Sequence, residues 1–196
     1  TQANISIQAG IEKLYTFGES IAANDAVYIE DSAADIVLID SNSDAGVDRV
    51  ISGATGTNEM AAQSFTESAV LRIHKIKLSL KETLTTTDNI QCGIQGDNAG
   101  VPDGTYIQSA TIAASTVTAS YTDITFTLGA VVTTVASTKY WIVLQRSGPR
   151  DTTNFINWAQ HASGSSYANG NAFVRDSGVW SAAGGSSQDY TFEFDM

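Results

Sequence analysis

The chain has 196 residues, 42% of them hydrophobic, and a formal net charge of −11. A chain of this length buries about 70% of the surface that its unfolded form exposes, so it can fold without metal or disulfide bridges. No apolar run approaches the roughly 20 residues of a membrane-spanning helix, and we expect no membrane insertion. The single cysteine, Cys92, excludes an intramolecular disulfide bond.

The charge is concentrated in the first third of the chain. Residues 1–69 carry 11 acidic side chains against Lys13 and Arg49, whereas the remaining residues carry 10 acidic and 8 basic ones. Such an acidic segment repels phosphate backbones. The one basic cluster contains no interleaved aromatic residues and consists of Arg72, Lys75, Lys77 and Lys81. We therefore expect no nucleic-acid partner.

Short strand-like segments punctuated by Gly, Ser, Asn and Asp fill the chain, and no segment keeps a period of 3.6, which predicts an all-β protein. We expect a small N-terminal β-module over residues 1–62 that attaches the protein to its neighbours. Its predicted strands are Ile5–Ile7, Leu14–Phe17, Ala26–Ile29, Ile36–Ile39 and Arg49–Ile51. The Gly/Thr/Ala-rich residues 53–62 are interpreted as a linker or, alternatively, as a loop within one continuous domain.

Residues 63–196 predict a β-sandwich, because apolar residues alternate along most of the predicted strands. Ile76, Leu78 and Leu80 share a face, but Ile73 has the opposite phase, which predicts a β-bulge at His74-Lys75. Residues 96–104 are expected to form a long polar turn. The continuous apolar run Lys139–Leu144 is expected in the middle of the sandwich with both faces covered. The alternating, aromatic Asp189–Asp195 strand is expected to pair inside a sheet.

Several strings of residues 64–196 carry a resemblance to a known family. They are Ile73–Lys81, Ile90–Ile94, Asp97–Gly104, Ile124–Leu128 and Lys139–Leu144. Together they resemble the jelly-roll "choice-of-anchor" domains, which recur in phage tail and head-surface proteins and in secreted bacterial proteins. The resemblance implies a jelly-roll-like antiparallel β-sandwich.

The N-terminal part is similar to a short β-module of phage virion proteins. The similarity rests on Gly18–Ile29 followed by Arg49-Val50-Ile51. The two resemblances together imply a virion structural protein on the particle surface, either a head decoration or fibre or a tail-associated protein. The implied partners are other capsid or tail proteins and further copies of the chain, with a host-surface glycan as a candidate ligand. The implied location is the extracellular virion surface.

No catalytic motif is present, so we expect no enzyme. Cys92 lies in a predicted strand, where we expect it to be buried, and only His74 and His161 are available as bases. The turn residues Asp97, Asn98 and Asp103 carry oxygen atoms of the kind that calcium binds. The alternative is that these residues only build a turn, since turns prefer the same residue types.

Aromatic residues among Ser, Gly and Asn in residues 154–180 suggest a surface that contacts a glycan or receptor. The candidate contacts are Trp158, His161, Tyr167 and Trp180. The alternative is that these aromatics cap the sandwich core. Two further functions stay open: a secreted carbohydrate-binding or adhesive module that uses these aromatics, and a subunit of an extracellular filament whose N-terminus donates a strand.

Overall fold

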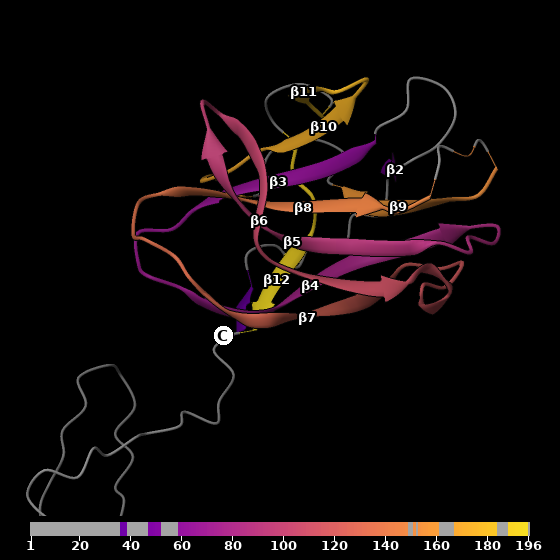
Figure 1. Cartoon of the computed structure of the whole chain (residues 1–196), viewed down its shortest axis with the longest axis horizontal. Helices are drawn as coiled ribbons and strands as arrows, with labels where there is room; N and C mark the ends of the chain where they lie inside the picture. The colour runs from indigo at the N-terminus through magenta and orange to yellow at the C-terminus, as the bar shows by residue number, and fades with distance from the viewer. Residues whose placement is uncertain are drawn as a thin grey trace, which may run out of the picture. The chain divides into compact units, whose positions relative to one another are not determined.

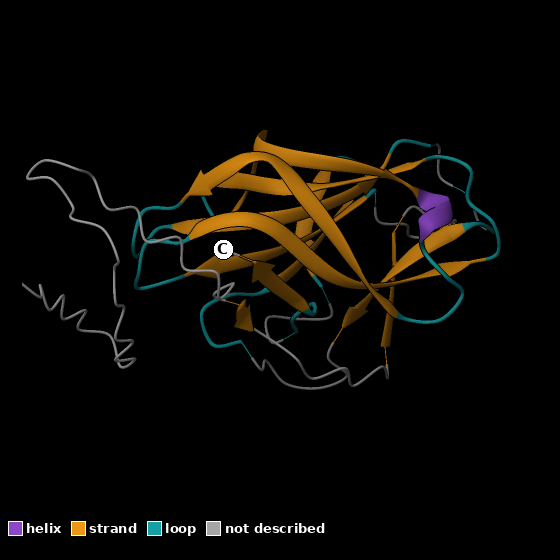
Figure 2. Ribbon diagram, turned by 90° about the horizontal axis from the view of Figure 1, so that it is seen from below, coloured by secondary structure: helices purple, strands orange, loops and turns teal. Residues whose placement is uncertain are grey.

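The structure, a computed structural model, describes residues 36–38, 47–51, 59–148, 151, 153–160, 167–183 and 188–195, with the backbone alone for the first two segments. All of them belong to one compact unit, residues 34–196. Apart from one short helical turn, their regular elements are strands (Figure 2).

The strands form two antiparallel sheets packed together, which confirms the predicted all-β sandwich (Figure 1). Sheet 1 contains β1 (Ile36–Leu38), β2 (Val47–Ile51), β4 (Arg72–Thr83), β7 (Thr122–Thr133), β9 (Phe155–Gln160) and β12 (Phe192–Asp195). Sheet 2 has the order β11-β10-β3-β8-β5-β6 and contains β3 (Met60–Thr66), β5 (Asn89–Asn98), β6 (Val101–Ala113), β8 (Lys139–Arg146), β10 (Ala172–Asp176) and β11 (Val179–Ala182). From β3 onward the chain crosses between the sheets at every connection except the β5–β6 and β10–β11 hairpins.

The long strand β4 organises sheet 1. β7 pairs along one of its edges, from Arg72 to Leu80. Since a strand has only two edges, the other one is shared: β12 pairs with Lys75–Leu78, and β9 pairs with Leu80–Thr83. β1 then pairs with β12, and β2 with β9. The C-terminal strand therefore lies inside the sheet, as its alternating aromatic pattern predicts.

The predicted bulge in β4 is also confirmed. Ile73 and Ile76 are both fully buried although they are three residues apart, and the pairing with β7 shifts between Ile73 and Lys75. His74 in between is exposed. The extra residue returns the apolar side chains of β4 to the core face.

Aromatic rings from distant parts of the chain meet in the core between the sheets. The Phe65 ring of β3 lies 4.9 Å from that of Phe194 and 5.9 Å from that of Tyr140, measured between centroids. Trp158 of β9 stacks on Tyr190 at 4.5 Å. Both Trp158 and Tyr190 are fully buried.

The structure corrects the domain boundary that was expected between residues 62 and 63. It falls inside β3, and β1 and β2 pair with β12 and β9. Hydrogen bonding within the two sheets thus joins the described part of residues 34–62 to the sandwich, as the alternative of one continuous domain implies. The predicted strands Ile5–Ile7, Leu14–Phe17 and Ala26–Ile29 lie outside the described residues.

Replacement of Phe194 by Ala should lower the free energy of unfolding by about 3–5 kcal/mol, because it leaves a cavity beside two other aromatic rings, those of Phe65 and Phe192. Urea denaturation followed by fluorescence measures this change. Thr125→Ala, at an exposed position of β7, is the control and should shift stability by no more than about 0.5 kcal/mol. A loss below about 1 kcal/mol for Phe194→Ala would contradict the packing described.

Candidate functional site: the outer aromatic cluster

The turn between β5 and β6 is much shorter than expected. The strands pair up to Asn98 and Val101, which leaves only Ala99 and Gly100 as the loop. Both have positive φ, 53° and 91°, as a type I′ hairpin turn requires. The expectation of a long polar turn over residues 96–104 is therefore wrong: Asp, Asn and Gly there build a tight hairpin whose arms are strands.

The three candidate calcium ligands of this hairpin do not converge. The two oxygens of Asp97 accept hydrogen bonds from the Trp141 indole Nε1 (2.8 Å) and the Gly100 amide (3.1 Å). Asp103 accepts from the Thr105 amide at 2.8 Å, and its other oxygen lies 2.7 Å from where a Cβ on Gly96 would stand. Since successive residues of a strand face opposite sides, Asp103 lies on the face opposite to Asp97.

The described residues contain no group of three or more His, Cys, Asp or Glu side chains that could hold a metal ion. Asn98, the third predicted ligand, is exposed at the end of β5. In this arrangement the hydrogen bonds of Asp97 and Asp103 stabilise the turn.

Two of the predicted glycan contacts belong to the core. Trp158 is fully buried and its indole Nε1 donates to the Thr191 carbonyl at 2.8 Å. Tyr167 is 6% exposed; burial, with a hydrogen bond to Glu67, raises the pKa of its phenol. These rings cannot stack on a ligand at the surface, so this part of the expectation is wrong, and they cap the core as the alternative holds. His161 lies outside the described residues.

Trp180, the fourth predicted contact, belongs to a second apolar cluster on the opposite side of sheet 2 from the core. We name this set the outer cluster; it consists of buried Ala62, Trp141 and Val143 with partly buried Met60, Tyr106, Phe173 and Trp180 packed against them. Along β8 the core-facing residues alternate with Trp141 and Val143, which is why these two point away from the core.

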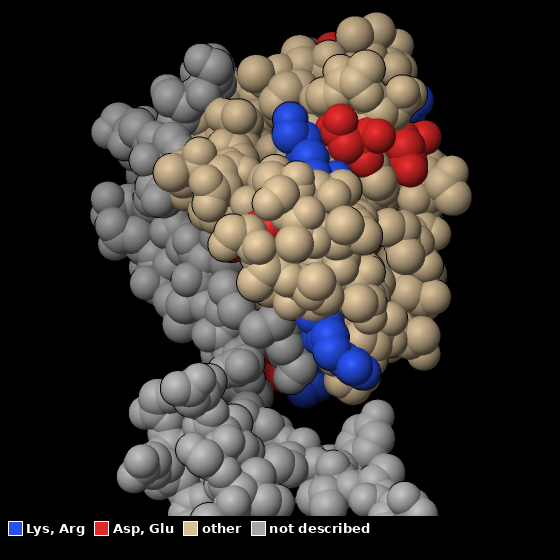
Figure 3. All heavy atoms as spheres, turned by 90° about the vertical axis from the view of Figure 1, so that its left-hand side faces the viewer, with Lys and Arg blue, Asp and Glu red and all other residues tan. Residues whose placement is uncertain are grey.

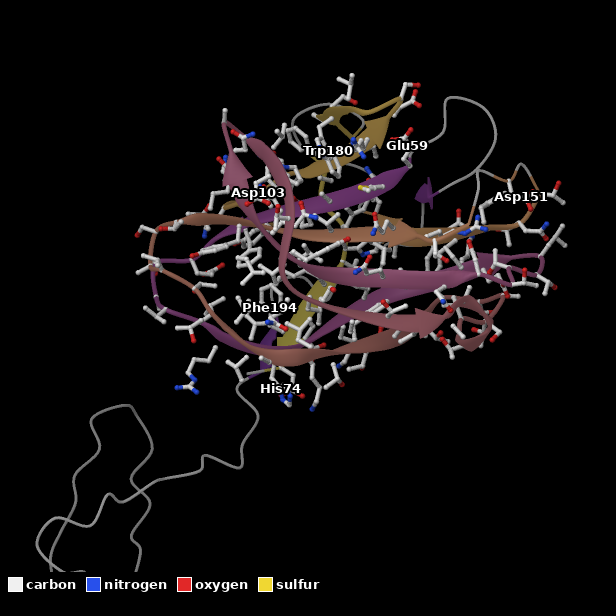
Figure 4. The ribbon with its side chains drawn as sticks, in the orientation of Figure 1. Glu59, His74, Asp103, Asp151, Trp180 and Phe194 are labelled. Atoms are coloured by element: carbon white, nitrogen blue, oxygen red, sulfur yellow. The ribbon has the colours of Figure 1, made fainter. Side chains whose placement is uncertain are left out.

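Two hairpins rise beside the outer cluster on this side of sheet 2 (Figure 4). The β5–β6 hairpin bends over it at an irregular stretch: the pairing shifts between Gln95 and Asp97, and Gly104 has a φ of +87°. The Gly104 amide donates to Gln95 Oε1 at 2.9 Å, which fixes the bend. The β10–β11 hairpin contributes Phe173, whose ring meets Trp141 edge-on at 5.0 Å.

Close packing explains a glycine at the base of the bent hairpin. A Cβ on Gly93 would stand 2.7 Å from the Tyr106 ring and 2.3 Å from the Gln108 carbonyl oxygen. Tyr106 therefore lies directly over the Gly93 backbone, and burial raises the pKa of its phenol. Only a residue without a side chain lets this ring approach the sheet.

Charged groups surround the outer cluster. Asp97 and Asp103 are exposed on the β5–β6 hairpin, and Glu59 lies beside the β10–β11 hairpin. Glu59 accepts a hydrogen bond from the Gly178 amide at 3.3 Å and lies 3.8 Å from the Arg175 guanidinium. Asp97 and Glu59 against one guanidinium give this surface an acidic border, whereas Asp103 lies on the other face of its hairpin.

The other reactive or charged side chains considered in the sequence are buried in the core or paired with neighbouring side chains. Cys92 is fully buried, as expected, and burial raises the pKa of its thiol, so the reactive thiolate is disfavoured. In the basic cluster of β4, Lys75 pairs with Asp195, and Lys77 with Glu193 at 2.9 Å. The hydrogen bond to Glu193 raises the pKa of Lys77. Lys81 lies over the Tyr121 ring.

Sequence reasoning found Trp180 but missed Trp141 and Tyr106 as members of a second cluster. A signal was present: the continuous apolar run Lys139–Leu144 implies cover on both faces, and only one face of β8 can pack on sheet 1. The cover of the other face had to come from elsewhere in the chain. A comparison of the chain with models of protein families finds no match, and neither does a comparison with curated proteins.

Replacement of Asp97 by Ala should destabilise the protein by about 1–3 kcal/mol, because it removes the acceptor of the buried Trp141 indole N–H. Asp103→Ala removes the same charge from the same hairpin but only an exposed backbone hydrogen bond, and should cost less than about 1 kcal/mol. Urea denaturation of both variants measures the difference. Equal losses would contradict the role assigned to Asp97.

Calcium should leave the thermal midpoint unchanged, because Asp97 and Asp103 face opposite sides of the hairpin. An ion bound at 100 times its Kd would stabilise the fold by about 2.7 kcal/mol, which a melting curve detects readily. Melting curves in calcium and in EGTA make the comparison. A calcium-dependent rise that Asp103→Asn abolishes would restore the metal site.

Proposed function

We propose that the chain is a structural protein of a virion surface, a head decoration or fibre or a tail-associated protein. In this proposal residues from the N-terminal region attach it to capsid or tail proteins, and the sandwich projects outward. The resemblance of residues 64–196 to choice-of-anchor domains suggests the location. One feature of the sandwich, a partly apolar end with a single charged residue in its loops, supports the proposal further.

This apolar end consists of two adjacent loops, residues 67–71 and 134–138, at the left of Figure 1. Hydrogen bonds join the two loops: Leu71 N donates to Thr134 Oγ1 at 2.8 Å, and Thr134 N to the Leu71 carbonyl at 3.0 Å. At their tips Val70 is 56% exposed and Val135 62% exposed. Glu67 is the one charged residue in the two loops, and its carboxylate accepts a hydrogen bond from the Tyr167 hydroxyl at 2.6 Å.

The same end faces the viewer in Figure 3, where groups of charged atoms lie above and below a largely uncharged area that contains a small acidic spot. In a chain with a net charge of −11, two exposed valines on adjacent loops with one charged residue between them support contact with another protein. A structural protein that packs against neighbours needs such a surface, whereas a monomeric secreted module does not.

The placement of the other residues fits a structural role. The buried Gln63 side chain donates to the buried carboxylate of Asp189 at 2.9 Å and accepts from the Tyr190 amide at 2.8 Å. Arg146, with only 4% of its side chain exposed, pairs with Asp88 at 2.9 Å. These polar side chains join distant segments of the framework. Among the described residues, no helix is long and apolar enough to cross a membrane.

Mass spectrometry of particles purified from the lysate in which the chain is produced tests the proposal. We expect the chain in the particles at a fixed ratio to the capsid or tail proteins, and its absence from them would overturn the proposal. Presence in filaments or in the free secreted fraction alone would favour the filament subunit or the secreted module.

A matched pair of variants tests the apolar end itself. Val135→Asp places a charge in the proposed contact and should lower incorporation into particles at least about tenfold, because burying an unpaired carboxylate is costly. Val179→Asp adds the same charge at a residue that is 68% exposed on β11 and should leave incorporation unchanged. Equal incorporation of both variants would show that the apolar end makes no contact.

A further inference from the structure

The outer cluster leaves aromatic surface accessible at its border. Ala62, Trp141 and Val143 are at most 1% exposed, so the floor of the cluster is already covered. Tyr106, Phe173 and Trp180 are only partly buried, and they come from three different strands. If the cluster only stabilised the fold, burying these rings completely would increase the free energy of unfolding further.

Trp180 is the largest of the three side chains. It lies on β11, an edge strand of sheet 2, where it pairs with Arg175 of β10. It packs against the outer cluster together with Phe173 and Met60, and Figure 4 shows it at the β10–β11 hairpin. The β10–β11 turn consists of Ser177 and Gly178, both with positive φ, so a tight type I′ hairpin fixes the position of the ring.

Polar groups stand beside the aromatic border. Asp97 lies on the β5–β6 hairpin and binds the Trp141 indole, and Glu59 and Arg175 lie on the side of the β10–β11 hairpin. A carboxylate offers about four acceptor sites, so each can bind a hydroxyl in addition to its contacts within the protein. Aromatic faces next to carboxylates match the two sides of a sugar ring, which has an apolar C–H face and a circumference of hydroxyls.

The charge at the border selects among sugars. Asp97 and Glu59 would repel a carboxylate or sulfate on a ligand, and Arg175 is already close to Glu59. A neutral oligosaccharide meets no such repulsion. Because the ring positions are fixed by two hairpins, a bound sugar would require little ordering of the protein.

We propose that the outer cluster is a binding site for a neutral oligosaccharide, which stacks on Trp180 and the adjacent rings and donates hydroxyl hydrogen bonds to Asp97 and Glu59. The site does not depend on a location in a virion: a particle that attaches to a cell surface and a free adhesive module would use it alike. It differs from the surface predicted from sequence, of which only Trp180 remains.

The full chain and a panel of immobilised neutral hexose oligosaccharides, with sialylated and sulfated ones for comparison, test this site. We expect binding to at least one neutral member, and weaker or no binding to its acidic derivatives. In solution the same sugar should protect tryptophan fluorescence from acrylamide, because Trp141 and Trp158 are buried and Trp180 alone is partly exposed. Absence of binding to every neutral member would overturn the proposal.

Matched variants assign the binding to the ring. Trp180→Ala should raise the Kd about tenfold, the loss expected for one aromatic contact, and Trp180→Phe should restore most of the affinity. Val179→Ala, the adjacent residue on the same strand, should have no effect. Melting curves establish that the variants are folded; if Trp180→Ala is not, the fluorescence protection and Trp180→Phe decide. Binding that is unchanged in a folded Trp180→Ala variant would overturn the site, whereas the particle experiment would be unaffected.

Discussion

Cover on both faces of β8 is the constraint on which the rest of the structure depends. β8 lies between β3 and β5 in the middle of sheet 2, and its central residues are buried on either side. On the core side, Ile142 and Leu144 pack against sheet 1. On the other side, Trp141 and Val143 need a separate cover, which the bent β5–β6 hairpin and the β10–β11 hairpin provide. The positive φ values of Gly100 and Gly104 and the close approach over Gly93 all serve that cover.

Much of this architecture can be predicted from the order of apolar and polar residues along single strands. Alternation places Ile76, Leu78 and Leu80 on one face of a strand, and the broken phase at Ile73 requires a bulge whichever strand lies beside it. The run Lys139–Leu144 can be buried on both faces only in the interior of a sheet. Such inferences succeed because the geometry of a single strand determines them.

The predictions that were wrong concern residues whose environment is determined by contacts between distant segments of the chain. Trp158 and Tyr167 sit among small polar residues, as surface aromatics often do, but they are buried because Tyr190 and Phe192 come to lie against them. The residues around Trp158 and Tyr167 in the sequence do not indicate that these rings will be their partners. The residues 96–104 have the composition of a loop, yet pairing across only two turn residues extends both strands through them. Composition cannot distinguish a loop from a bulged hairpin, because both need Gly and Asp at positions of unusual φ.

The interior place of β12 has a consequence for how the protein forms. Residues 192–195 pair with β4 on one edge and with β1 on the other, so segments near residues 36, 77 and 194 must assemble together. During synthesis, β4 is made long before β12, and its edge stays open until residue 195 has left the ribosome. Such late, long-range pairing predicts slow folding through an intermediate in which one edge of β4 is still unpaired. Lys75 and Lys77, which alternate with apolar residues along that strand, would repel the same residues of a second unfinished chain and so oppose edge-to-edge pairing.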